Sequence, residues 1–566
     1  DGVTTIGDSA FYECESLTSI VIPENVNTIE GSAFAGCTNL INITIPDSVT
    51  TIVSDPFVNT PWLEERRKEN PLVIVNGFLI DGKTAVGDIL IPEEVKHICY
   101  FCFCKCENLT SVIIPEGVTD IGSFAFGDCK KLKKIDMPKS ISSIGYKAFE
   151  NSLWLEEQRE KNPLVIVNGI LVDGKSASGN VIIPDGVTII GDDAFFKCVG
   201  LVNIAIPDSV TSIGYSAFSC CEKLISIKIP DSVDSIGDSA FKGCSALKDI
   251  TISDNVIKLE YNTFWDCSSL TSITIPEKIT SLYSHLGTPF VGCSNLKSIN
   301  VSPNNKNYTD INGVLFNKDV TTLIYMPNNY PRSVYAIPDG VIEIENHAFD
   351  RCLNLSTISI PDSVKNIGRF AFCCCEKLKD IKIPDSVESI GESAFIDCSS
   401  LSNIVLPDSV MNISELLFTR CSSLEKIKIS NSATSIGRRS FWKCTNLKNI
   451  IIPDSVSKID AYAFAECTNL KEVTICNSNI DIEENIFYRC TSLEKVIIPE
   501  ELKELFNKIS YRQIQILSKN SNLSSEQQIN QNSISKLNGL VGLSAIKSDV
   551  MGLVNLIKIQ NKRKEM

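Results

Sequence analysis

IAIPDSVTSIGYSAFSCC occupies residues 204–221, and IKIPDSVDSIGDSAFKGC occupies residues 227–244. The two stretches align at an offset of 23 residues and share the template LxxIxIPxSVxxIGxxAFxxC. The Phe of this template returns at positions 11, 34, 57, 103, 126, 149, 195, 218, 241, 264, 290, 349, 372, 395, 418, 441, 464 and 487. A period of about 20–50 residues is typical of repeat proteins, in which each unit buries its apolar side against its neighbours.

The alternation of side chains within one unit indicates the secondary structure. Ile20 and Ile22 alternate with Ser19 and Val21, as in a strand that has one buried face. The Ala-Phe-x-x-Cys segment then supplies apolar side chains for the opposite wall. Leucine-rich repeats run about 20–29 residues and place one strand in each repeat. The sequence therefore predicts an α/β repeat fold, a leucine-rich-repeat solenoid over residues 1–500 with a parallel sheet on one face.

The template resembles the BspA-like leucine-rich-repeat family, above all in IPDSVTSIGYSAFSCCEKL (206–224) and its copies. The resemblance covers residues 1–500. Members of that family are surface or secreted proteins that adhere to or bind host proteins. The resemblance implies a binding role without identifying a ligand.

Three longer units, at residues 58–95, 150–187 and 303–338, interrupt the regular period. The first two share WLEE…NPLVIVNG…DG at an offset of 92, which predicts a short helix followed by a β-hairpin. The third contains INGVLFNKDVTTLIYMP (311–327), which also predicts a hairpin. These units are expected to decorate the solenoid.

Charge and hydropathy exclude several classes of partner. The formal net charge is −15, whereas nucleic acids and anionic membranes are bound by basic surfaces. No apolar run has the length of about 20 residues that a membrane-spanning helix needs. Asp1 falls inside a repeat, so we expect the chain to be a piece of a longer protein.

The chain has 23 cysteines, and sixteen of them share one template position. A buried free thiol packs as a small apolar group, so this column is interpreted as core packing in a reducing setting. The spacing of Cys99, Cys102, Cys104 and Cys106 is compatible with zinc ligands. They occupy different template positions, however, and should point in different directions. The clusters 220–221 and 373–375 are interpreted as packing in the same way, and no metal site is predicted.

Two strings match the phosphate-binding pattern GxxxxGK[ST], GFLIDGKT (77–84) and GILVDGKS (169–176). That pattern binds phosphate when a glycine-rich loop joins a strand to a helix. Here the intervening residues are strand-forming and no helix follows. We interpret Asp81-Gly82 and Asp173-Gly174 as hairpin turns, and we expect no nucleotide or other cofactor in this chain.

No catalytic constellation is evident. The three histidines, His97, His285 and His347, fall in unrelated units. The acidic residues of the PDSV segments lie where Asp stabilises a turn. The chain is therefore predicted not to be an enzyme.

The outward strand positions are free to contact a partner. The predicted protein-binding face consists of Lys228, Asp249, Asp380, Lys382, Lys426 and Lys428. Repeat solenoids use such extended surfaces for binding. The alternative is a polar sheet that is only solvated.

The template stops near residue 500. Residues 501–535 are predicted to form a terminal helix and a polar linker, because 518–535 are rich in Ser, Asn and Gln. Residues 536–566 predict an amphipathic helix and resemble the start of an AAA+ ATPase of the CbbX and sporulation-protein-K kind. Val541 and Gly542 match the segment that lies beside adenine in that family. The resemblance implies that ATP with magnesium, and an AAA+ oligomer, would belong to a longer parent protein.

Two hypotheses follow from these observations. In the first, the chain is the recognition part of a protein that carries a C-terminal AAA+ motor and acts in the cytoplasm. In the second, it is a cell-surface or secreted adhesin. An enzyme acting through this chain has no support from its residues.

Overall fold

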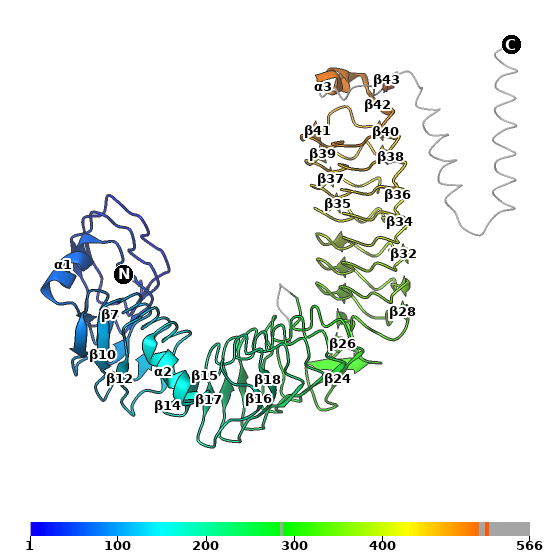
Figure 1. Ribbon diagram of the computed structural model, residues 1–566. Coiled ribbons are helices and arrows are strands. Elements are labelled where there is room, and N and C mark those ends of the chain that lie inside the picture. The colour runs from blue at the N-terminus through cyan, green and yellow to red at the C-terminus, as the bar shows by residue number, and fades with distance from the viewer. Residues whose placement is uncertain (1, 283–286, 509–514, 520–566) are drawn as a thin grey trace, which may run out of the picture.

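The computed structural model describes residues 2–282, 287–508 and 515–519, and it is a long curved solenoid (Figure 1). The stack changes direction near helix α2 (Leu153–Lys161) and again near strand β26 (Val314–Asn317) (Figure 1). Nearly every unit contributes short parallel strands. The predicted leucine-rich-repeat solenoid is confirmed.

The first ladder of strands, here the wide ladder, contains the Ile-x-Ile segments, and its strands have three to five residues. Its members are β2 (Ser19–Val21), β4 (Asn42–Thr44), β8 (Gly87–Leu90), β10 (Leu109–Ile113), β12 (Lys134–Asp136), β16 (Gly179–Ile182), β18 (Leu201–Ala205), β20 (Ser226–Lys228), β22 (Asp249–Thr251), β23 (Ser272–Ile275), β24 (Ser298–Val301), β28 (Val334–Ala336), β30 (Thr357–Ser359), β32 (Asp380–Lys382), β34 (Asn403–Val405), β36 (Lys426–Lys428), β38 (Asn449–Ile452), β40 (Glu472–Ile475), β42 (Lys495–Pro499) and β43 (Gln515–Lys519). In β20 and its relatives the middle Ile is buried and its two neighbours are exposed, as the alternation predicts.

A second ladder, here the narrow ladder, was not indicated by the sequence. It consists mainly of two-residue strands at the Ser-Ile or Thr-Ile pair that precedes the template Gly. Its members are β1 (Thr5–Ile6), β3 (Thr28–Ile29), β5 (Thr51–Ile52), β9 (His97–Ile98), β11 (Asp120–Ile121), β13 (Ser143–Ile144), β17 (Ile189–Ile190), β19 (Ser212–Ile213), β21 (Ser235–Ile236), β29 (Glu343–Ile344), β31 (Asn366–Ile367), β33 (Ser389–Ile390), β35 (Asn412–Ile413), β37 (Ser435–Ile436), β39 (Lys458–Ile459) and β41 (Asp481–Ile482). In the C-terminal stack β35–β41 and β34–β40 line opposite sides (Figure 1).

The glycine after the narrow strand is explained by close approach of the preceding turn. A Cβ on Gly237 would lie 2.5 Å from the backbone nitrogen of Tyr215. A side chain at Gly237 would therefore need the neighbouring backbone to move, although other units carry Cys99, Glu345, Ser414 or Asp460 at the same template position.

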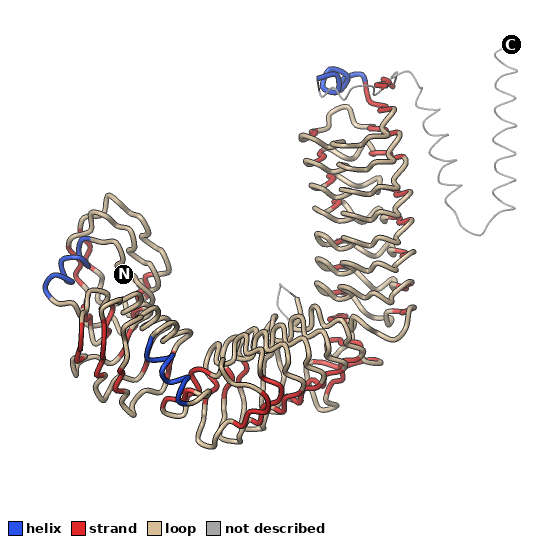
Figure 2. The backbone as a smooth tube through the Cα atoms, in the orientation of Figure 1, coloured by secondary structure: helices blue, strands red, loops and turns tan. Residues whose placement is uncertain are grey.

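The third side, here the turn wall, holds the Ala-Phe-x-x-Cys segments. It is built of turns, and adjacent turns are joined by backbone hydrogen bonds such as Phe218 N–H to the Ala240 carbonyl, 2.8 Å. The Phe side chains stack inside it: the rings of Phe218 and Phe241 lie 5.4 Å apart at 2°. Figure 2 shows that helices are confined to three places in the described chain. The repeating unit is thus a three-sided coil without a helix.

The cysteine column lies behind the Phe stack. Cys244 is fully buried, and its thiol donates to the carbonyl oxygen of Phe218 at 3.1 Å. Burial raises the pKa of Cys244 to about 12, so the group remains a thiol at neutral pH. From Cys37 onward the column fills space, as predicted, and its thiols also donate to carbonyl groups of an adjacent turn.

The decorated units confirm the predicted β-hairpins but correct where they turn. After α1 (Pro61–Glu69), β6 (Val73–Val75) pairs antiparallel with β7 (Phe78–Asp81), and after α2, β14 (Val165–Val167) pairs with β15 (Ile170–Asp173). The hairpin turn is therefore Asn76-Gly77, not Asp81-Gly82, and Asn168-Gly169, not Asp173-Gly174. Asn76 and Gly77 have φ of 49° and 80°, which suits the Asn-Gly hairpin turn.

The third insertion has three antiparallel strands, β25 (Tyr308–Ile311), β26 and β27 (Thr322–Tyr325). The apolar core of the described residues falls into four clusters whose boundaries lie at the three insertions. The second and third insertions therefore lie where the stack changes direction.

Past residue 499 the chain forms η1 (Glu500–Leu502) and α3 (Lys503–Lys508). Strand β43 then pairs with β42, so the wide ladder extends into the segment that the sequence assigned to a linker. None of the helices in the described residues combines the length and apolar character needed to cross a membrane.

Candidate interaction face

The six residues of the predicted face are all exposed on the wide ladder. They fall into two groups. Lys228 and Asp249 lie on β20 and β22 of one sheet, whereas the other four lie on β32 and β36 of another. The third insertion separates the two sheets, so the structure does not bring the six residues into one site.

The second group is compact. Strand β34 alone separates β32 from β36, and the register aligns Asp380 with Asn403 and Asn403 with Lys426. Adjacent strands are about 4.8 Å apart. The side chains on β32 and β36 can therefore contact the same segment of a partner.

Two exposed aliphatic residues complete this group, and the sequence reasoning missed them. Val405 is 59% exposed and aligns with Lys428, and Ile451 is 65% exposed on the neighbouring strand β38. Their signal was present, because they occupy the same outward template position as Lys382 and Lys428. We call Lys382, Val405, Lys426, Lys428 and Ile451 the lysine patch.

The lysines of this patch have no acidic partner within 4 Å among the described residues. By contrast, cations of the turn wall pair with acidic residues of an adjacent turn, as Arg369 does with Glu392 at 2.7 Å. The amines of the patch are exposed to water and can be approached from outside. The lysine patch thus offers unpaired positive charge beside apolar area, on a chain that is acidic overall.

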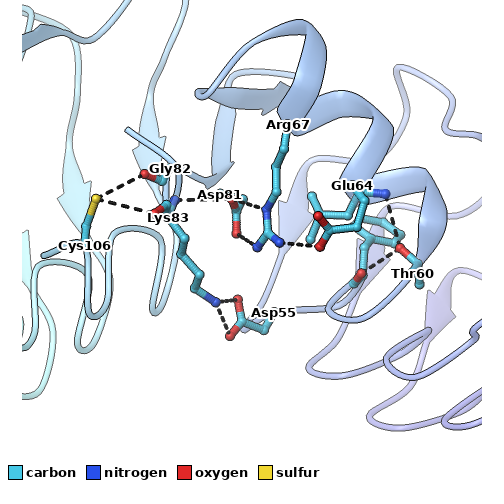
Figure 3. Close-up of polar contacts among 10 residues, drawn as sticks. Asp55, Thr60, Glu64, Arg67, Asp81, Gly82, Lys83 and Cys106 are labelled. Atoms are coloured by element: carbon cyan, nitrogen blue, oxygen red, sulfur yellow. Dashed lines mark hydrogen bonds and ion pairs between the residues drawn. The ribbon is translucent and has the colours of Figure 1, made fainter. Parts of the chain in front are cut away.

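The first phosphate-loop match is held by ion pairs of the fold (Figure 3). Lys83 Nζ lies 3.0 Å from Asp55, and the buried Asp81 carboxylate accepts two hydrogen bonds from Arg67, at 2.8 and 2.6 Å. Arg67 also contacts Glu64 on the same helix. The lysine that would contact phosphate is therefore already engaged with a carboxylate.

The second match repeats this arrangement. Lys175 Nζ lies 3.0 Å from Glu150, and Arg159 binds Asp173 at 2.8 and 2.7 Å. The two strings are strands and turns of the decorated units, with α1 and α2 preceding rather than following them.

The remaining candidate residues are scattered. The thiols of Cys99 and Cys106 point to different carbonyl oxygens, those of Ile52 at 3.8 Å and Ala85 at 3.0 Å. His97 stacks on Phe78 and bonds Asp120. Val541, Gly542 and His285 lie outside the described residues.

Comparison with known proteins identifies relatives of this architecture. The chain matches the BspA type leucine rich repeat region in six copies, over residues 4–76, 81–161, 174–297, 224–334, 331–448 and 434–550. No curated protein matches the sequence.

Solved structures of bacterial repeat proteins resemble the fold. A leucine-rich repeat protein from Eubacterium ventriosum is 27% identical, with 55% of this chain and 82% of that chain covered and a TM-score of 0.50. One from Bacteroides ovatus is 24% identical, covering 78% and 94%, with a TM-score of 0.39. A leucine rich cell surface protein from Faecalibacterium prausnitzii is 22% identical, covering 87% and 90%, with a TM-score of 0.26.

Proposed function

Because the chain belongs to the BspA-type leucine-rich-repeat family, we propose that it is a recognition protein whose lysine patch binds an acidic surface of a partner protein. The observation that carries the proposal is the unpaired state of Lys382, Lys426 and Lys428 on an exposed face. Exposed lysines lose little hydration when they pair with acidic groups at the edge of an interface. Complementary charge also accelerates association and orients the two proteins.

The aliphatic members of the patch favour a protein partner over a nucleic acid. Val405 and Ile451 stand in the same column as Lys428, so cationic and apolar side chains alternate along the ladder. Protein interfaces combine an apolar centre with a polar rim. A nucleic acid would instead be repelled by a chain whose formal net charge is −15.

The proposal assigns no catalysis to this chain. Binding through an exposed sheet needs neither a nucleophile nor a cofactor, and the two lysines that match the phosphate-loop pattern are engaged with Asp55 and Glu150. We expect isothermal titration with Mg-ATP to give no saturable heat. A micromolar site that disappears in Lys83→Ala and Lys175→Ala would contradict this expectation.

Charge reversal tests the binding face. The partner is captured from the source cells with the wild-type chain, identified by mass spectrometry and then titrated in purified form. Lys428→Glu should weaken binding about 10-fold or more, since a repulsive pair replaces an attractive one.

Lys228→Glu is the matched control, because it changes the same charge in the same column of another sheet. It should bind almost as well as wild type. Equal binding by all three proteins, or a loss only on deletion of 303–338 or 536–566, would show that the partner binds elsewhere.

The proposal includes a larger parent protein in which this chain selects the target and a C-terminal AAA+ module acts on it. Its support is the resemblance of residues 536–566, which lie outside the described residues. The complete reading frame tests it. A GxxxxGK[ST] motif after Met566 favours the ATPase, and an upstream signal peptide favours the alternative, a surface or secreted adhesin.

A further inference from the structure

The turn wall brings together three potential metal ligands in the C-terminal stack. A carboxylate oxygen of Asp350 and the sulfurs of Cys373 and Cys374 lie within 4.8 Å of one another. The two sulfurs are 3.4 Å apart and the cysteines are free. Within the described residues, this is the one group of three metal-ligating side chains whose ligand atoms lie this close together.

The carboxylate is poorly satisfied by the protein itself. Asp350 is 3% exposed, and its Oδ1 atom has no hydrogen-bond partner in the described structure. The buried Nδ1 of His347 also lacks one, and it lies 3.6 Å from the other carboxylate oxygen, Oδ2. An unpartnered buried carboxylate is costly, and a bound cation is one way to offset that cost.

These two cysteines differ from the cysteine column beside them. Cys375 belongs to the column, since it is fully buried and its thiol donates to the Phe349 carbonyl at 3.1 Å. Cys373 and Cys374 are half-buried and point away from the core, toward Asp350 and Asp397. The interpretation as packing therefore suits Cys375 but not its two neighbours.

We propose that Asp350, Cys373 and Cys374 form a binding site for one thiophilic divalent cation, with Zn²⁺ as the ion that fits best. Zinc is bound in proteins by thiolate, imidazole and carboxylate groups in tetrahedral geometry. Zn–S bonds of about 2.3 Å set two tetrahedral sulfurs about 3.8 Å apart. The observed 3.4 Å is close to this spacing, so small side-chain rotations complete the site.

His347 acts as a positioning residue in this arrangement. Asp350 binds the ion through Oδ1, and His347 Nδ1 faces the other carboxylate oxygen, Oδ2, at 3.6 Å, the place from which an outer-shell partner orients a ligand at metal sites. Three protein ligands leave the fourth position to a water molecule. The half-buried thiols provide the route by which the ion enters.

The charges around the site have both signs. Asp397 lies 3.9 Å from the Cys374 sulfur and is bound by Arg420, whereas Arg351 places one positive charge beside Asp350, which the carboxylate and two thiolates of the loaded site outweigh. Metal binding then displaces the thiol protons into solvent.

The chain supplies its own control at an equivalent turn. The 23-residue period places Phe196, Ser219 and Cys220 where a second vicinal cysteine site could have formed, and the carboxylate and one thiol are missing there. The Ser219 hydroxyl and Cys220 sulfur are 3.8 Å apart. Cys220→Ser therefore removes a half-buried thiol from the same template position without touching the proposed site.

The test is titration of the full, reduced chain with Co²⁺ as a spectroscopic substitute, followed by competition with Zn²⁺. Wild type and Cys220→Ser should show one equivalent of a thiolate-to-cobalt charge-transfer band. Cys373→Ser/Cys374→Ser should lose it. Asp350→Asn should weaken binding, and His347→Ala should weaken it about 10- to 100-fold.

A thermal melt distinguishes a variant that has lost metal binding from one that has lost its fold. Zn²⁺ should raise the melting temperature of wild type and Cys220→Ser but not of Cys373→Ser/Cys374→Ser, since a ligand stabilises only the state that binds it. The proposal fails if the reduced wild type gives no saturable band, if Cys220→Ser loses the band equally, or if the two thiols instead form a disulfide that Zn²⁺ cannot prevent.

Discussion

The turn wall and the stretch of the wide ladder from β32 to β36 differ in how their outward charges are paired. On the turn wall, Arg420 binds Asp397 and Lys443 lies 3.7 Å from Glu466, each pair being one 23-residue period apart. On the wide ladder, Lys426 and Lys428 have no acidic partner within reach in the described residues. The wide ladder has ion pairs elsewhere, Lys134 with Asp136 and Lys495 with Glu472, so it is the stretch from β32 to β36 that leaves its lysines for a partner.

The two sides also differ inside. The turn wall is filled by a stack of Phe rings, whereas the wide ladder contributes one or two buried aliphatic side chains from each strand, such as Ile227 of β20 or Ile450 and Ile452 of β38. Aromatic rings bury more area per residue and prefer an offset stack. The turn wall should therefore carry more of the stability of the solenoid, and the wide ladder more of its specificity.

The largest effect is expected from the Phe stack. Phe241→Ala should destabilise the chain by about 3–5 kcal/mol, because it removes a fully buried ring that contacts a ring on each side. Urea unfolding followed by circular dichroism measures the change. Phe196→Ala, on the same wall but half-buried, is the control. Equal losses for the two variants would contradict a stack-based origin of stability.

A smaller effect is expected from the paired charges of the turn wall. The side chains of Arg420 and Asp397 are 45% and 29% exposed, so their coupling should be worth about 1 kcal/mol or less. A double-mutant cycle with Arg420→Ala and Asp397→Ala isolates this coupling. A coupling near zero at low salt would mean that the wall does not use its charges to join turns.

The smallest effect on stability is expected on the lysine patch. Lys426→Glu/Lys428→Glu should change the free energy of unfolding by only about 0.5 kcal/mol, as is usual for exposed positions away from packing. Thermal melts in parallel with the binding titration measure both quantities. A large drop in melting temperature would show that these lysines stabilise the sheet instead of selecting a partner.

The sequence predicts which side chains of the wide ladder point outward, but it does not predict the narrow ladder or the position of the hairpin turns. The exposed state of Lys382 and Lys428 follows from the alternation of one strand. The narrow ladder escaped prediction because two residues are too few to show a strand pattern. The hairpin turns were misplaced because Asn-Gly and Asp-Gly lie five residues apart and both suit a turn.

The sequence by itself determined the interior of this protein, because each unit repeats the same inward side chains and each must cover the next. Only the tertiary structure decided which outward residues meet, since a contact between turns depends on where the backbone places two side chains. Asp350 and Cys373 are separated by one period and form part of a cluster of potential metal ligands. The residues at the same two template positions in an earlier pair of turns are Phe196 and Ser219, which cannot form such a cluster. Likewise, stacking pairs Arg420 with Asp397 and leaves Lys428 beside Val405. The core is periodic, whereas the surface depends on which residues successive turns happen to align.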